Sequence, residues 1–159
     1  MGRMKLQLGQ PAPEFSAVSD DGRHVRLQDL RGQWTVLYFY PRANSYGCSI
    51  EAQRFEQFLP QFAALGAQVI GISTDAAPGQ AAFREKCGLS YPLLPDPDQT
   101  ICRAYGVVGG LTGLLGVSGR ASFVIDPQGL LVHQRHDLNH TVHVQAALQA
   151  IREKQEQLA

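Results

Sequence analysis

The sequence has few cysteines and no excess of either charge, and each shortage excludes a class of protein. Only three cysteines occur in 159 residues, and an odd, widely spaced set does not form the disulfide framework of a small secreted domain. Basic and acidic residues both number 14, whereas surfaces that bind nucleic acid or anionic membranes carry a basic excess. We therefore expect no nucleic-acid partner, and free thiols in a reducing compartment.

Long apolar runs are also lacking. No run approaches the roughly 20 residues that a membrane helix requires. The opening residues, MGRMKLQLGQPAPEF, lack the apolar stretch of a secretory signal. Internal repeats, long linkers and charged tails do not occur either. These absences predict a single cytoplasmic domain over residues 1–159, with no membrane association.

The apolar patterns that are present predict both strands and helices. The expected strands are 34–40, 67–73, 120–126 and 130–136, and the expected helices are 48–64, 77–88, 99–106 and 142–158. The first strands must be parallel because crossover helices join them, whereas the turn DPQG joins an antiparallel pair. Residues 15–27 predict a hairpin around an Asp-Gly turn. The prediction is an α/β protein with a thioredoxin-like fold: a mixed central sheet flanked by helices, with an N-terminal β-hairpin extension.

The most informative stretch is YFYPRANSYGCSIEAQRF, residues 38–55. Pro41 ends an apolar run, a short polar loop follows, and Cys48 lies where the expected helix begins. Unpaired N–H groups and partial positive charge at a helix N-terminus favour the thiolate form of a cysteine. Cys48 is therefore a candidate nucleophile, although its position alone also fits a small buried hydrophobic residue.

Two segments resemble the active site of peroxiredoxins. PRANSYGCSIE is similar to the family loop Pro-x-x-x-Thr/Ser-x-x-Cys with a Glu three residues later, and the matching residues are Pro41, Ser45, Cys48 and Glu51. GRASFVIDPQG resembles the segment whose arginine, here Arg120, reaches back to that cysteine. The order of the other segments is also similar to that of the PrxQ branch, also called bacterioferritin comigratory proteins.

The resemblance implies a thiol-dependent peroxidase that reduces hydrogen peroxide and organic hydroperoxides. Cys48 would attack one peroxide oxygen and become a sulfenic acid, while Arg120 would stabilise the charge that develops on the other. Ser45 would position the peroxide, Pro41 would shield the pocket from water, and Glu51 would hold the guanidinium. Each residue also has an ordinary alternative as a helix cap, strand end or surface charge.

The chain departs from the branch pattern at the resolving cysteine. PrxQ members often carry it five residues after the first cysteine, where this chain has Gln53. Cys87 is our first choice, because some family members resolve from the helix that follows the second strand. Cys102 reads as a core residue. A one-cysteine cycle with an external thiol, or a peroxide-sensing protein, remains an alternative.

Other features bear on partners and competing functions. The resemblance implies thioredoxin or a similar dithiol as reductant, no cofactor, and a monomer or weak homodimer. A disulfide oxidoreductase would need Cys-x-x-Cys, but Ser45 and Glu51 stand three residues on either side of Cys48. Ser45 and Tyr46 replace the usual Thr and Pro, which predicts a less preorganised loop. The glycine-rich segment 109–119 lacks the ending of a phosphate loop. It is expected to be an ordinary loop under the helices, with a loop over the active site or a docking patch as alternatives.

Histidines crowd the segment HQRHDLNHTVH. They are His133, His136, His140 and His143. No cysteine or carboxylate pattern completes a metal site beyond Asp137. We therefore expect surface and cap histidines and no metal.

Overall fold

The computed structural model describes residues 6–43, 45–108 and 118–158. Its centre is a five-stranded sheet with the strand order β5-β4-β3-β6-β7. The strands are β3 (Trp34–Phe39), β4 (Ala67–Ser73), β5 (Leu93–Pro95), β6 (Ala121–Ile125) and β7 (Leu131–His136). β3, β4 and β5 run parallel, whereas β6 is antiparallel to both β3 and β7. The predicted mixed sheet is confirmed.

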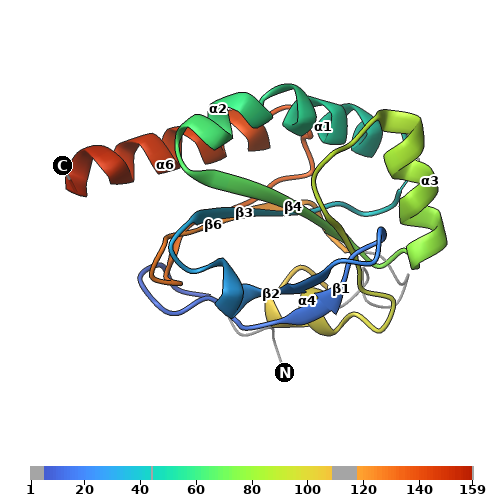
Figure 1. Cartoon of the computed structure of the whole chain (residues 1–159), viewed down its shortest axis with the longest axis horizontal. Helices are drawn as coiled ribbons and strands as arrows, with labels where there is room; N and C mark the ends of the chain where they lie inside the picture. Colours follow the sequence, from blue (N-terminus) through green and yellow to red (C-terminus); the bar gives the residue numbers. More distant parts are fainter. Residues whose placement is uncertain (1–5, 44, 109–117, 159) are drawn as a thin grey trace.

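Helices cover both faces of this sheet (Figure 1). One face carries α1 (Tyr46–Gln57), α2 (Leu59–Ala64), α3 (Ala77–Cys87) and α6 (His143–Leu158). The other face carries α4 (Thr100–Ala104) and an antiparallel hairpin of β1 (Ser16–Val18) and β2 (His24–Arg26). The thioredoxin-like layout and the N-terminal hairpin are therefore as predicted. None of the helices described here has the length and apolar character needed to cross a membrane.

The central strand β3 separates two hydrophobic cores. Successive side chains of a strand point to opposite faces. Val36 and Tyr38 accordingly pack in the core beneath α1, α3 and α6, whereas Leu37 and Phe39 pack in the core beside α4. A strand buried on both faces reads as a continuous apolar run, which is why β3 was predictable from sequence alone.

The helix expected over residues 48–64 is interrupted in the structure. α1 starts at Tyr46, within two residues of the expected start, but it ends at Gln57, and α2 begins at Leu59 after a break at Phe58. Pro60 explains the break, because proline has no N–H to donate to the carbonyl four residues earlier and its ring crowds that carbonyl. The early start places Cys48 in the first turn of α1.

Candidate active site

The register of the sheet brings Cys48 and Arg120 together. β3 leads into the loop before α1, and Phe39, at the end of β3, pairs with Ala121, at the start of antiparallel β6. Arg120, the residue before β6, therefore lies beside the loop and the first turn of α1. Its Nη2 donates to Cys48 Sγ over 3.4 Å, although 72 residues separate the two in sequence. Cys48 is only 1% exposed.

Three contacts orient the guanidinium of Arg120. Nη1 donates to Glu51 Oε1 over 2.7 Å, Nη2 to Cys48, and Nε to the Leu138 carbonyl over 3.1 Å. Burial opposes the charge, yet Glu51 and Cys48 together raise the pKa of Arg120 above its ordinary value. Among the described residues, these contacts use three of the five N–H groups that a guanidinium offers. Two N–H groups remain to donate to a substrate oxygen.

Glu51 is buried beneath this guanidinium on the first turns of α1. Its side chain is 1% exposed, and among the described residues its Oε2 has no hydrogen-bond donor. Burial raises the pKa of Glu51 to about 7, against the opposing effect of Arg120. Ionising this carboxyl group near neutral pH therefore depends on the ion pair with Arg120.

The loop before α1 is held by a residue that the sequence did not indicate. Asp75 Oδ2 accepts bonds of 2.7 Å from the Ala43 N–H and from the Ser73 hydroxyl. Parallel strands end at the same edge of a sheet, so the residues after β4 lie beside the loop that follows β3. Pro41, the first residue of this loop, is half-buried. Asp75 thus anchors the segment that carries Pro41.

Ser45 occupies the N-cap position of α1 without acting as a side-chain cap. The cap position shows no side-chain hydrogen bond to the helix. Instead, Ser45 Oγ donates to the Arg42 carbonyl over 2.9 Å. A hydroxyl oxygen has two lone pairs, so Ser45 can still accept a hydrogen bond from a substrate. The next residue, Tyr46, is 83% exposed.

A histidine from the loop between β7 and α6 approaches this site, and another begins α6. His140 lies against Gly47: a Cβ added at Gly47 would be 3.3 Å from His140 Cδ2 and 3.4 Å from Arg120 Nη2. His143 opens α6 and is 0% exposed. His143 therefore begins a helix, as expected, but the expectation of a surface position is wrong for it. A polar ring is expected at the surface, but the burial of His143 is compensated because both ring nitrogens form hydrogen bonds inside the protein.

Comparison with known proteins identifies the family. The model of the AhpC/TSA family matches residues 8–134. A putative peroxiredoxin of Mycobacterium tuberculosis is 39% identical over 145 residues, which cover 88% of this chain and 91% of that protein. The chain belongs to the peroxiredoxin family. It is a thiol peroxidase, an oxidoreductase that reduces a peroxide at the expense of a thiol.

Solved structures place this peroxiredoxin in the PrxQ branch, as the sequence predicted. The peroxidoxin BcpB of Mycobacterium tuberculosis matches with a TM-score of 0.84 and 33% identity, over 93% of this chain and 97% of that chain. The bacterioferritin comigratory protein of Xanthomonas campestris matches with a TM-score of 0.84 and 27% identity, over 93% and 99% of the two chains. That protein is described with alkyl peroxide reduction activity.

The two other cysteines of this peroxiredoxin lie in different cores. Cys87, the last residue of α3, is half-buried and packs against the core that contains Cys48. Cys102, on α4, is 0% exposed in the opposite core. Burial raises the pKa of Cys102, and the adjacent Asp96 raises it further. All three cysteines are free thiols in this structure.

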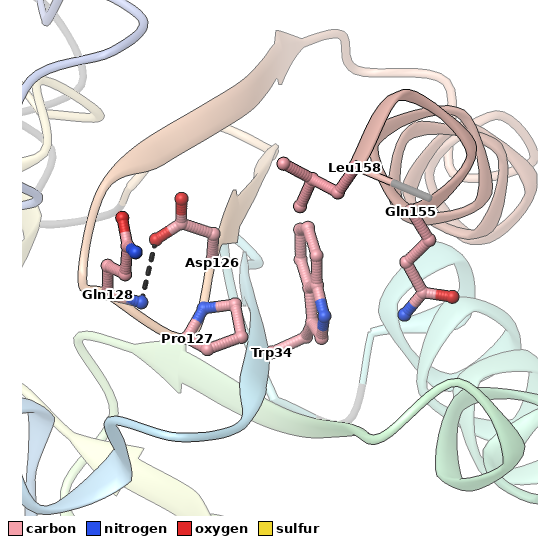
Figure 2. Close-up of a pocket in the computed structure, with 6 residues that line it drawn as sticks. All are labelled: Trp34, Asp126, Pro127, Gln128, Gln155 and Leu158. Carbon is pink, nitrogen blue, oxygen red and sulfur yellow. Dashed lines mark hydrogen bonds between the residues drawn. The ribbon is translucent and has the colours of Figure 1, made fainter.

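A pocket of about 330 Å³ lies beside Trp34, and Figure 2 shows the side chains that line it. Its lining residues are Trp34, Asp126, Pro127, Gln128, Gln155 and Leu158. Trp34 begins β3, whereas Cys48 follows the end of that strand, so this pocket contains none of the predicted site residues. In the described ranges, no three His, Cys, Asp or Glu side chains gather in a way that could hold a metal ion. Most of the glycine-rich segment 109–119 lies outside the described residues.

Proposed function

We propose that Cys48 is the peroxidatic cysteine of this thiol peroxidase and that Arg120 is its main electrostatic partner. The observation that carries the proposal is the 3.4 Å contact between Arg120 Nη2 and Cys48 Sγ in the first turn of α1. Both residues are buried. A charged donor is most effective in such a setting, because little water competes for the reacting atoms.

In the proposed reaction, the Cys48 thiolate attacks one oxygen of a hydroperoxide ROOH. An S–O bond forms, the O–O bond breaks, and the electron pair leaves on the other oxygen as RO⁻. The sulfur is oxidised to sulfenic acid, and RO⁻ takes a proton from water to give an alcohol, or water when R is hydrogen. The two remaining N–H groups of Arg120 donate to the peroxide oxygens, and they stabilise the charge that develops on the leaving oxygen.

Three further residues organise this reaction. Glu51 holds the guanidinium through the 2.7 Å bond to Nη1. Ser45 Oγ accepts a hydrogen bond from the peroxide, while the Ser45 hydroxyl continues to donate to the Arg42 carbonyl. Pro41, which is half-buried, contributes no N–H and would shield the reacting atoms from water. The Asp75 carboxylate supports this arrangement by fixing the Ala43 N–H.

Cys87 is the proposed resolving cysteine. Its thiolate attacks the Cys48 sulfenic acid, an S–S bond forms, and hydroxide leaves and is protonated to water. Cys87 shares the core of Cys48, whereas the sheet separates Cys102 from it. The half-buried Cys87 ends α3 next to Gly88, whose left-handed conformation (φ 69°) closes the helix. Unwinding this last turn of α3 would release Cys87 with little loss of helix.

The substrates and setting follow from the family and are proposals for this chain. Hydrogen peroxide and alkyl hydroperoxides fit, because the relative from Xanthomonas campestris is described with alkyl peroxide reduction activity. Thioredoxin or a similar dithiol would reduce the disulfide back to two thiols. We expect the chain to act in the cytoplasm as one domain over residues 1–159, as a monomer or weak homodimer.

The test is single-turnover oxidation of the reduced protein by hydrogen peroxide, followed by stopped-flow fluorescence. Cys48→Ser should abolish the reaction. Arg120→Ala should lower the second-order rate constant by about a hundred- to a thousandfold, as removal of a preorganised donor does elsewhere. Arg120→Lys keeps the charge but lacks the planar fork of the guanidinium, so its rate constant should lie between those of the parent and Arg120→Ala. An Arg120→Ala protein as fast as the parent would overturn the mechanism.

A further inference from the structure

Two hydrogen bonds join Arg120 to the segment Asp137–Leu138. The Asp137 N–H donates to the Arg120 carbonyl over 3.1 Å, and the Leu138 carbonyl accepts from Arg120 Nε over 3.1 Å. One short segment therefore fixes both the backbone and the side chain of the arginine. Because the guanidinium is planar and rigid, a bond that fixes Nε also restricts where Nη1 and Nη2 point.

This segment is not held in place by apolar packing of its own. It follows β7, and Leu138 is 76% exposed. Among the described residues, the Asp137 side chain bonds only to its neighbours Arg135 and Asn139. The contact that ties the segment to α6 is made by His143, whose Nε2 lies 2.7 Å from the Asp137 carbonyl. The other ring nitrogen, Nδ1, lies 2.8 Å from Ser122 Oγ. Ser122 is two residues after Arg120 on β6, so it faces the same side of the sheet.

The partners of His143 decide its tautomer. A carbonyl oxygen only accepts, so Nε2 carries the hydrogen and donates it to Asp137. Nδ1 then accepts from the Ser122 hydroxyl. Burial lowers the pKa of His143, and the nearby charge of Arg120 lowers it further, against the bond to Asp137. The ring is therefore neutral at physiological pH, and both of its nitrogens are in use.

We propose that His143 is a positioning residue for peroxide reduction, acting through the Asp137–Leu138 segment on Arg120. The chain of contacts runs from Ser122 through His143 to the Asp137 carbonyl, and from Asp137 and Leu138 to Arg120. His143 touches neither Cys48 nor the peroxide. This inference rests on the role proposed above for Arg120, because without that role the position of the guanidinium would not matter.

Three substitutions separate the two hydrogen bonds of His143. The side-chain amide of His143→Gln places an N–H near the position of Nε2 and keeps the bond to Asp137. His143→Asn places its side-chain amide near the position of Nδ1 only. This variant therefore keeps the hydrogen bond to Ser122 and loses the one to the Asp137 carbonyl. His143→Phe keeps the ring volume and loses both bonds. Phenylalanine leaves buried polar groups without partners and can unfold the protein, so the comparison of Gln with Asn carries the decision.

The measured quantity is the second-order rate constant for Cys48 oxidation by hydrogen peroxide in single turnovers. We expect His143→Gln to stay near the parent. His143→Asn should lose about ten- to a hundredfold, the range expected when a reacting group is misplaced by an ångström or less. Equal rates for the Gln and Asn variants would overturn the proposal.

A double-mutant cycle tests whether the effect passes through Arg120. In an Arg120→Ala background, adding His143→Asn should change the rate constant by less than about twofold, because residues that act as one unit are not additive. An unchanged tenfold loss in that background would show that His143 acts independently of Arg120 and would overturn the proposal. His133→Phe is the matched control: this half-buried histidine on β7 has no hydrogen-bonding partner for its buried Nε2 among the described residues.

The same experiment keeps the two proposals apart. If Arg120→Ala alone leaves the rate constant unchanged, the assigned role of Arg120 has failed. If Arg120→Ala is slow while His143→Asn equals the parent, only the role of His143 has failed.

Discussion

Glu51 and Arg120 form an ion pair whose Oε1–Nη1 distance is 2.7 Å, with side chains that are only 1% and 8% exposed. The pair is asymmetric. Arg120 makes further bonds to Cys48 and Leu138, whereas Glu51 Oε2 is buried without a donor among the described residues. Burial of half of the carboxylate without compensation explains why the pKa of Glu51 is raised to about 7.

This asymmetry predicts a pH-dependent stability. The pKa of Glu51 rises from 4.5 to about 7 on folding, so its contribution is complete below pH 4.5 and is lost as the pH rises through 7. Glu51→Gln removes this loss. The free energy of unfolding of the variant, relative to the parent, should therefore increase between pH 5 and pH 8, by on the order of 2 kcal/mol. Urea denaturation at several pH values measures it.

The amide also changes the hydrogen bonds and packing around this side chain at every pH, so the slope of the difference against pH, and not its absolute value, is the informative quantity. Glu153→Gln, a substitution of an exposed carboxylate on α6, serves as the control and should run parallel to the parent. Parallel curves for Glu51→Gln as well would contradict the prediction.

A methyl group at Gly47 should slow the enzyme without unfolding it. Alanine normally stabilises a helix by about 1 kcal/mol relative to glycine. At Gly47, however, the new Cβ would lie 3.3 Å from His140 Cδ2 and 3.4 Å from Arg120 Nη2, which forces one of them to shift. We expect the melting temperature of Gly47→Ala to be unchanged or higher. Its rate constant for peroxide should be lower by about tenfold, because the guanidinium is displaced.

Two variants identify the cause of that loss. Adding His140→Ala should restore most of the rate by giving the methyl group room. Gly79→Ala on α3, where the new Cβ would be 3.9 Å from Asp75, should leave the rate at the parental level. A fully active Gly47→Ala protein would mean that the loop accommodates the methyl group freely.

Removing the Asp75 carboxylate should destabilise the loop before α1. Asp75→Ala leaves the Ala43 N–H and the Ser73 hydroxyl without their shared acceptor. We expect a loss of about 1 to 3 kcal/mol in the free energy of unfolding, together with slower oxidation of Cys48. Asp75→Asn retains an acceptor and should lose less. Asp29→Ala, at an exposed position, is the control, and chemical denaturation gives the comparison.

The opposite cores of Cys87 and Cys102 predict which thiol pairs with Cys48. After one equivalent of hydrogen peroxide, non-reducing peptide mass mapping with a sulfenic-acid trap should show a Cys48–Cys87 disulfide. That linkage should survive Cys102→Ser and vanish in Cys87→Ser, in which trapped sulfenic acid on Cys48 replaces it. Trapped sulfenic acid in the parent without any linkage would indicate a one-cysteine cycle. A Cys48–Cys102 linkage would contradict the arrangement of the two cores.

The sequence predicted those parts of the molecule in which a local pattern determines the structure. β3 is a continuous apolar run, and the motif around Cys48 and Glu51 spans four consecutive positions of one helix. Arg120 was found through resemblance, because no local pattern links residues that are 72 positions apart. Only the pairing of β3 with β6 explains why it reaches Cys48.

The missed residues share a physical reason. Asp75, His140 and His143 act through contacts between segments that are distant in sequence, and polar residues in loops are expected to be solvated. Asp75 can hold the loop that follows β3 because the parallel strand β4 ends beside that loop. The polar residues around His143 in the sequence predict an exposed side chain, but at the start of α6 this side chain is buried.

The antiparallel pairing of β3 with β6 has a consequence for the nascent chain. Arg120 follows Cys48 by 72 residues, so the ribosome releases the cysteine well before its arginine. Until β6 joins the sheet, Cys48 is an unassisted thiol without its cationic neighbour. For the proposed active site, this order means that assisted peroxide reactivity would be acquired only when the last quarter of the polypeptide docks.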